Sequence, residues 1–171
     1  MDRKILFVDD DESVIDLIEG ILLLAKYQVI EAGSEATALN ILNLDPPDAA
    51  IIDVHLTKMK DMQGLELCRG IKTNLRTQHI PVIMMSGDDR DENLILRSFA
   101  ANAVDFMRKP FKAVELLARL EKRLEDVAYS LMVKNDFKPI ISLKIFGQGD
   151  FERRLKQGFS FYRHVREGIV I

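Results

Sequence analysis

An alternation of five short apolar runs with segments of helical spacing constrains the fold of this chain more than any other feature. The apolar runs are rich in branched side chains, which predicts buried strands. Between them, apolar residues recur at steps of three and four, which predicts amphipathic helices. The strand runs are 5–8, 27–30, 49–52, 81–85 and 104–107. Because parallel strands need crossover helices, the alternation predicts an α/β fold with a doubly wound, five-stranded parallel sheet and helices on both faces.

Composition and charge agree with a globular chain of this class. The 171 residues are 47% apolar and 30% charged, and the net charge of −3 excludes the strongly cationic surface that would indicate nucleic acid or anionic lipid. Residues 1–125 carry 16 Lys and Arg against 22 Asp and Glu, whereas residues 126–171 carry 8 against 5. We therefore expect a domain over 1–125 and a basic C-terminal extension over 126–171.

The sequence shows no signal for export or membrane insertion. The apolar run near the N-terminus has only four residues, which is too short for a secretory core or a membrane span. The chain has a single cysteine, Cys68, so it cannot form an intramolecular disulfide. Such cysteine usage is typical of proteins in a reducing compartment. We expect a cytoplasmic protein.

Polar residues follow four of the predicted strands at the edge where such sheets bind ligands. The first strand is followed by Asp9-Asp10-Asp11, the third by Asp53, the fourth by Ser86 and the fifth by Lys109. Clustered carboxylates need a counter-charge, and their hard oxygens suit Mg²⁺. A carboxylate nucleophile, a metal, a fixed cation and a hydroxyl are what phosphoryl transfer to an aspartate requires. The pattern therefore predicts a phosphoryl-transfer site.

Four motifs carry a family resemblance at these strand ends. They are Phe7-Val8-Asp9-Asp10, Ile51-Ile52-Asp53, Met85-Ser86-Gly87 and Lys109-Pro110-Phe111. In this order they resemble the receiver domain of two-component response regulators, of the chemotaxis-regulator kind. The resemblance implies a flavodoxin-like sheet with strand order 2-1-3-4-5. It also implies a signalling switch rather than an enzyme, at most self-phosphorylating and autodephosphorylating, which receives a phosphoryl group from a histidine kinase or a phosphotransfer protein.

The resemblance also implies a role for each site residue. Asp53 corresponds to the phosphoacceptor, and Lys109 and Ser86 to the groups that contact the phosphoryl oxygens. Ser86 and Phe106 correspond to the switch hydroxyl and the switch aromatic side chain. The family's Mg²⁺ ligands correspond to Asp9, Asp10, Asp53 and the backbone carbonyl of His55. The Lys109–Pro110 bond is similar to one that is usually cis.

The segment after the acceptor departs from the family pattern. Thr57 stands where many members have a proline, and Gly64 lies eleven residues past Asp53 rather than about eight. The segment 57–63 is therefore about three residues longer than usual, which we interpret as a tolerated change of loop length. Asn102 stands where a glycine is frequent.

Other roles are open for some of these residues. Asp11 and Glu12 precede a helix, where acids commonly cap the helix and interact with its dipole, and we favour that role over metal binding. Ser86 could instead cap the next helix.

Two other functions remain as alternatives. A phosphatase of the haloacid dehalogenase type would use Asp9 as its nucleophile, but it would need an acidic pair after Lys109 and would leave Asp53 without a role. A receiver-like interaction module that is never phosphorylated is the other alternative. The acidic pair and the lysine argue against such a module, while the longer loop keeps it open.

The last helix and the tail are less informative. Val114 and Leu117 begin an apolar face that continues as a possible coiled-coil seam and homodimer contact. The seam comprises Leu117, Leu120, Leu124, Val127 and Leu131. Residues 139–146 alternate weakly, like a strand, and the tail is too short for a core of its own. Its mixture of aromatic and basic residues favours docking on the acidic domain or on a protein partner over binding nucleic acid.

Overall fold

The computed structural model describes residues 3–56, 62–88 and 93–142, with side chains up to Val133. Within these ranges five strands alternate with five helices, as the sequence predicted. The strands are β1 (Lys4–Val8), β2 (Gln28–Ala32), β3 (Ala49–Asp53), β4 (Val82–Ser86) and β5 (Asp105–Arg108). The helices are α1 (Glu12–Leu24), α2 (Glu35–Leu44), α3 (Gln63–Thr73), α4 (Leu94–Ala100) and α5 (Ala113–Ser142). The predicted strands differ from these bounds by one or two residues.

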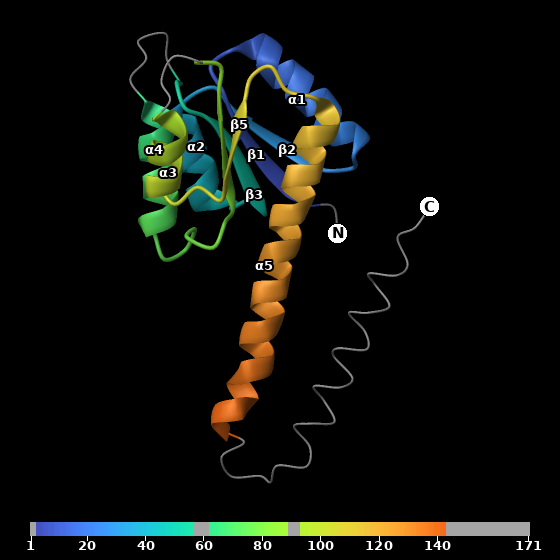
Figure 1. Cartoon of the computed structure of the whole chain (residues 1–171), viewed down its shortest axis with the longest axis vertical. Coiled ribbons are helices and arrows are strands. Elements are labelled where there is room, and N and C mark those ends of the chain that lie inside the picture. Colours follow the sequence, from blue (N-terminus) through green and yellow to red (C-terminus); the bar gives the residue numbers. More distant parts are fainter. Residues whose placement is uncertain (1–2, 57–61, 89–92, 143–171) are drawn as a thin grey trace. The chain divides into compact units, whose positions relative to one another are not determined.

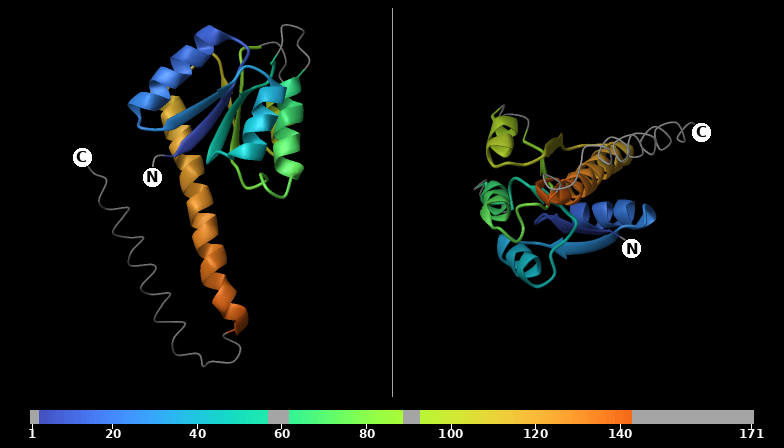
Figure 2. Two further views of the ribbon diagram at one scale, coloured as in Figure 1. Left: turned by 180° about the vertical axis from the view of Figure 1, so that it is seen from behind. Right: turned by 90° about the horizontal axis from the view of Figure 1, so that it is seen from below.

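The sheet is parallel throughout and has the order β2-β1-β3-β4-β5, which confirms the prediction. Helices α1 and α5 cover one face, and α2, α3 and α4 cover the other (Figures 1 and 2). The strand order reverses between β1 and β3, where Val8 is in register with Ile52. In open sheets of this kind the carboxyl ends of the strands at the reversal form the ligand-binding edge.

Burial differs among the strands, and the edge strand β2 is the most exposed of them. All residues of β3 and β4 are buried, and so are those of β1 after Lys4. In β2, only Ala32 is buried, so the prediction of burial on both faces is wrong for this strand. Strand β2 lies at the edge of the sheet, where the flanking helices cover it less completely. In the centre, Met84 and Met85 are core residues, with no exposed surface.

Helix α1 confirms the capping role predicted for the acids that precede it. Asp11 is the N-cap residue, and its side chain accepts a hydrogen bond of 2.9 Å from the backbone N–H of Ser13. Glu12 occupies the first turn, where a negative charge interacts favourably with the helix dipole. These two acids therefore stabilise the helix end that follows β1.

Helix α5 corrects several predictions. Its buried face begins with Leu116, whereas Val114 is 72% exposed and Leu117 is half-buried. Leu120 and Leu124 are buried in the core of their own domain, so the seam predicted for a homodimer is not available as a whole. The helix continues to Ser142, so residues 139–142 are helical rather than a strand, and 143–146 lie outside the described residues.

The chain divides into two units, residues 1–129 and 130–171, with the division inside α5. The boundary that the sequence predicted, after residue 125, also falls within this helix. Among the described residues, no helix combines the length and the apolar character that a membrane span requires.

Candidate functional site

Two buried carboxylates lie side by side at the carboxyl ends of neighbouring strands. Asp9 directly follows β1 and is 2% exposed, and Asp53 is the last residue of β3 and is 6% exposed. The backbone N–H of Asp9 donates to the carbonyl of Ala32 at 3.2 Å, which extends the pairing of β1 with β2. Both acids therefore lie where the strand order reverses.

A single ammonium group joins these two carboxylates. Lys109, just after β5, places its Nζ 2.6 Å from Oδ2 of Asp9 and 2.8 Å from Oδ1 of Asp53. Its backbone N–H donates to the carbonyl of Ser86 at 2.8 Å, and the Lys109–Pro110 bond is cis, as the resemblance implied. The structure thus brings together three of the residues that the sequence singled out from three different strand ends.

The other two oxygens of these carboxylates accept hydrogen bonds from the backbone. Oδ1 of Asp9 accepts from the N–H of Asp11 at 3.1 Å, and Oδ2 of Asp53 accepts from the N–H of His55 at 2.8 Å. Each oxygen retains further lone-pair capacity after one such bond. Both side chains are therefore fixed in orientation and can still accept another ligand.

The cluster carries more negative than positive charge. Burial raises the pKa of Asp9, and the charge of Asp53 raises it further, although Lys109 opposes both effects. Burial by itself lowers the pKa of the Lys109 ammonium, but attraction and hydrogen bonds from Asp53 and Asp9 outweigh it, so the pKa lies above its ordinary value. Lys109 therefore stays protonated at neutral pH, and one positive charge faces two carboxylates.

The oxygen atoms of this site suit a magnesium ion that takes only a few of its ligands from the protein. Among the described residues, no three His, Cys, Asp or Glu side chains are grouped as a metal site. Mg²⁺ does not require such a group, because it commonly takes one or two carboxylates and keeps several waters. Asp9 and Asp53 supply hard oxygens in a buried, net negative environment, and Asp10 beside them is exposed. His55 is half-buried directly beyond the β3 end.

The two residues expected to form the switch lie on neighbouring strands. Ser86 is the last residue of β4, is 2% exposed, and accepts a hydrogen bond from the N–H of Asp88 at 3.1 Å. It does not cap α4, whose N-cap residue is Asn93, so that alternative is wrong. Phe106 on β5 pairs with Met84, two residues before Ser86, and lies in the core beneath α2, α3 and α4.

Gly64 makes a contact that sequence reasoning did not find. A Cβ added to it would lie 1.8 Å from the backbone oxygen of Asp53, and its N–H donates to the carbonyl of Val54 at 3.1 Å. The sequence drew attention to Gly64 only through its unusual distance from the acceptor. In the structure this glycine packs on the backbone of Asp53, although most of the long segment between them, residues 57–61, lies outside the described residues.

We expect Asp9→Asn to raise the free energy of unfolding at pH 7 by about 1 kcal/mol, the usual scale of a single substitution. Because the folded-state pKa of Asp9 is raised, the stability it contributes is complete below its unfolded-state pKa and is lost as the pH rises through the folded-state value. The amide can still accept from Lys109 without a buried charge. Urea unfolding at pH 7 measures the change.

Asp11→Asn is the matched control for this prediction. Asp11 is exposed and caps α1, and its hydrogen bonds with Ser13 lower the pKa of its carboxylate. The same substitution two residues away should therefore bring no gain in stability. If Asp9→Asn were no more stable than the original chain, burial of the Asp9 charge would not be unfavourable.

Comparisons with known proteins agree with this geometry. The sequence model of the protein family described as the response regulator receiver domain matches residues 5–121 of this chain. The alkaline phosphatase synthesis transcriptional regulatory protein PhoP of Bacillus subtilis is 35% identical over 141 residues, which are 80% of this chain and 55% of PhoP. The chain spans about half or less of the length of the first curated relatives that it matches.

Solved structures show the same similarity. NtrX of Brucella abortus in complex with ADP superimposes with a TM-score of 0.72 and 31% identity, over 82% of this chain and 30% of that one. A CheY-like response regulator receiver domain protein of Methanospirillum hungatei superimposes with a TM-score of 0.68 and 26% identity, over 76% of this chain and 99% of that one. The similarity thus covers the part of the chain that carries Asp9, Asp53 and Lys109.

Proposed function

This chain belongs to the family of response regulator receiver domains, and on that premise we propose that it is a phosphorylation-dependent signalling switch of a two-component system, with Asp53 as the phosphoacceptor. The observation that carries the proposal is the ammonium of Lys109 held between Asp9 and Asp53 at the β1 and β3 ends. A fixed cation beside a buried carboxylate is suited to hold phosphoryl oxygens as their charge develops.

In the proposed reaction, an oxygen of Asp53 attacks the phosphorus of a phosphohistidine on a histidine kinase or a phosphotransfer protein. The phosphorus–nitrogen bond breaks as the aspartyl phosphate forms, and the released imidazole takes up a proton from solvent. Lys109 contacts one phosphoryl oxygen and keeps the acceptor oriented before transfer. Ser86, at the neighbouring strand end, donates its hydroxyl to another phosphoryl oxygen.

The proposed metal is Mg²⁺, which would be held by Asp9 and Asp10 together with Asp53 and the backbone carbonyl of His55. When bound, the ion neutralises charge on the phosphoryl group during transfer. The net negative charge and the hard oxygens at Asp9 and Asp53 support this choice.

The proposed signal is a change of packing on the side of β4 and β5. Ser86 accepts from the N–H of Asp88, which leaves its O–H able to donate to the phosphoryl group and so to draw Ser86 toward it. Movement of Ser86 would allow Phe106 to repack, which shifts the population of the face formed by α4, β5 and α5. The protein is thereby a switch rather than an enzyme that acts on an external substrate.

We place this switch in the cytoplasm. Cys68 is a buried free thiol, as suits a reducing compartment. The downstream partner is a protein that distinguishes the two states of the α4, β5 and α5 face.

Intact mass spectrometry after incubation with acetyl phosphate and Mg²⁺ tests the proposal. We expect one phosphoryl adduct on the original chain, dependent on Mg²⁺, and none on Asp53→Asn. Asp11→Asn is the control, because it changes an exposed acid of the same edge and should be labelled normally. Undiminished labelling of Asp53→Asn would overturn the assignment. A folded original chain without any adduct would favour an interaction module that works without phosphorylation.

A further inference from the structure

Met62 has an unusual backbone conformation for its place in the fold. It is the N-cap residue of α3, where an extended conformation is typical, but its φ of 54° and ψ of 27° lie in the left-handed region. Among the described residues other than glycine, Lys26 and Asn102 also have a positive φ. Both of these lie just after a helix, where the left-handed region is common, whereas Met62 precedes one. Such a conformation persists only where the surrounding structure holds it.

A side chain from α4 contacts Met62. Nη1 of Arg97 donates to Sδ of Met62 at 3.0 Å. The side chain of Met62 is half-buried and packs against the core beneath α2, α3 and α4. It makes no hydrogen bond to the first turn of α3, so this helix begins without a side-chain cap. The contact with Arg97 and the packing on the core therefore hold the strained start of α3.

The start of α3 in turn contacts the backbone of Asp53. Gly64 lies two residues beyond Met62, and a Cβ added to it would lie 1.8 Å from the backbone oxygen of Asp53. The N–H of Gly64 donates to the carbonyl of Val54 at 3.1 Å. The N–H of Leu65 donates to the carbonyl of Met62 at 2.9 Å. Met62 and Gly64 thus lie in one hydrogen-bonded turn, so a displacement of Met62 reaches the end of β3.

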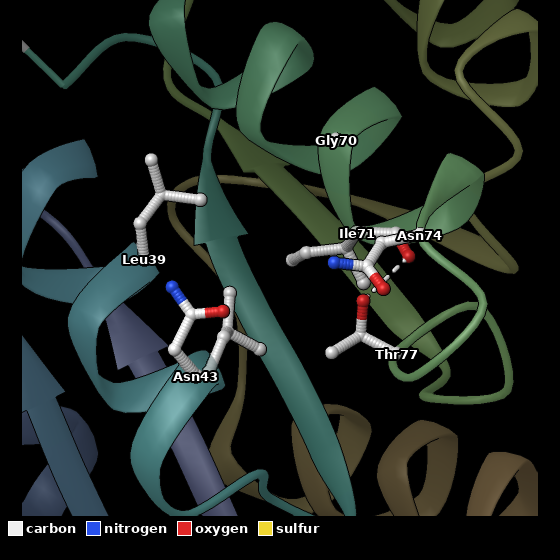
Figure 3. Close-up of a pocket in the computed structure, with 7 residues that line it drawn as sticks. Leu39, Asn43, Gly70, Ile71, Asn74 and Thr77 are labelled. Atoms are coloured by element: carbon white, nitrogen blue, oxygen red, sulfur yellow. Dashed lines mark hydrogen bonds between the residues drawn. The ribbon is translucent and has the colours of Figure 1, made fainter.

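The other end of α3 is fixed independently. The hydroxyl of Thr77 donates to the carbonyl of Ile71 at 2.9 Å, beside the hollow between α2 and α3 (Figure 3). The ammonium of Lys72 donates to two backbone carbonyls of the connection that leads to β4. The C-terminal end of α3 is therefore tied to this connection by side-chain hydrogen bonds. The first turn is the part of the helix whose position depends on α4.

We propose that Arg97 is a positioning residue for the acceptor, and that it acts from α4 through Met62 on the backbone of Asp53. This inference rests on the proposed function of Asp53. Helix α4 belongs to the face proposed to carry the signal, so the contact gives this helix a connection to Asp53 that does not pass through Ser86 or Phe106. Because coupling between two sites is reciprocal, a partner that binds α4 would also change the environment of Asp53.

Hydrogen exchange of the Gly64 amide, followed by NMR on the full chain, tests the contact without phosphodonor or Mg²⁺. Arg97→Met removes the donor and keeps an unbranched side chain. It should speed the exchange of this amide about threefold, a factor that matches the small net free energy of one hydrogen bond. Met62→Leu keeps the apolar volume and removes the sulfur, so it should have a similar effect. The double variant should add little to either substitution.

Arg76→Met is the matched control. Arg76 is an exposed arginine beyond the other end of α3, so the same substitution changes the net charge by the same amount at the far end of the helix. It should leave the exchange of the Gly64 amide unchanged and act independently of Met62→Leu. Unchanged exchange in Arg97→Met would overturn the proposal. Effects of Arg97→Met and Met62→Leu that simply add in the double variant would also overturn it.

The rate of phosphorylation by acetyl phosphate and Mg²⁺ separates this inference from the proposed function. We expect Arg97→Met and Met62→Leu to be labelled about threefold more slowly than the original chain, and Arg76→Met at the original rate. Normal labelling of both the original chain and Arg97→Met would overturn only the role of Arg97. An original chain without any adduct would overturn the proposed function, and the positioning role with it.

Discussion

Gly64→Ala is expected to lower the free energy of unfolding by about 1–3 kcal/mol, the scale of overpacking in a filled interior. The added methyl would lie 1.8 Å from the backbone oxygen of Asp53 and 2.9 Å from its carbonyl carbon. Neither atom belongs to a flexible side chain, so either the first turn of α3 or the end of β3 must move. Leu65 beside Gly64 and Cys68 one turn further along α3 are buried in the core and oppose that movement.

Gly70→Ala provides the control on the same helix. Nothing lies within 4 Å of a Cβ at Gly70, so alanine should bring only its better helix propensity, about 0.5–1 kcal/mol of added stability. Urea unfolding of both variants separates a clash at Asp53 from a general effect of helical glycine. If Gly64→Ala and Gly70→Ala had similar free energies of unfolding, the close contact between Gly64 and Asp53 would be contradicted.

Gly64→Ala should also impair the proposed acceptor. Any relief of the clash moves the backbone that carries Asp53, and with it the contacts of its carboxylate with Lys109 and the N–H of His55. Phosphorylation by acetyl phosphate should therefore slow in Gly64→Ala and stay unchanged in Gly70→Ala. The clash thus links the start of α3 to the acceptor by direct contact.

Most of the fold could be predicted from periodicity alone. Steps of three and four alternating with short apolar runs predicted a parallel, doubly wound sheet, because parallel neighbours require crossover helices, whereas the strand order came from the family resemblance. The details that failed depend on the finished fold. The predicted run 27–30 is mostly apolar, but strand β2 lies at an edge of the sheet and its Gln28 and Glu31 are exposed. Leu116 and Leu117 are adjacent leucines, and only the direction in which α5 packs decides that Leu116 is buried.

The site was predictable to the extent that strand ends define it. Asp9, Asp53 and Lys109 each follow a predicted strand, so the topology itself brings them to one edge. The contact of Gly64 with Asp53 was not predictable, because the two residues are eleven positions apart and the sequence pattern does not show that the segment between them brings them together. Asn102 illustrates the opposite case, since its φ of 63° explains why a residue tolerant of the left-handed region stands where glycine is frequent.

Lys109→Met should reduce the rate of phosphorylation by about 100-fold, the scale of losing one preorganised charge-stabilising group. The ammonium lies 2.8 Å from the proposed acceptor oxygen of Asp53 and 2.6 Å from Asp9, so no other group of the described cluster compensates the two carboxylates. Lys112→Met is the control, because Lys112 is an exposed lysine of the same connection. It should be phosphorylated at the original rate.

Lys109→Met should also make the free energy of unfolding depend more strongly on pH. Without the ammonium, burial and repulsion by Asp53 are opposed only by the hydrogen bond from the N–H of Asp11, so the folded-state pKa of Asp9 rises further above its unfolded-state value. Stability is then present at low pH and is lost as the pH rises through that folded-state pKa. Lys109→Met should lower the free energy of unfolding only slightly at pH 4 and by about 2 kcal/mol at pH 8. The loss is smaller than for a fully buried ion pair because Lys109 is partly exposed.

Combining Lys109→Met with Asp9→Asn separates the two roles of the lysine. The double variant has one buried carboxylate fewer, so it should recover most of the stability lost at pH 8. It should not recover phosphorylation, because Asp53 still lacks the cation that is proposed to hold the phosphoryl oxygens. Urea unfolding at the two pH values and intact mass after acetyl phosphate measure both effects. A stability difference independent of pH would mean that Lys109 contributes through packing of its chain rather than through its charge.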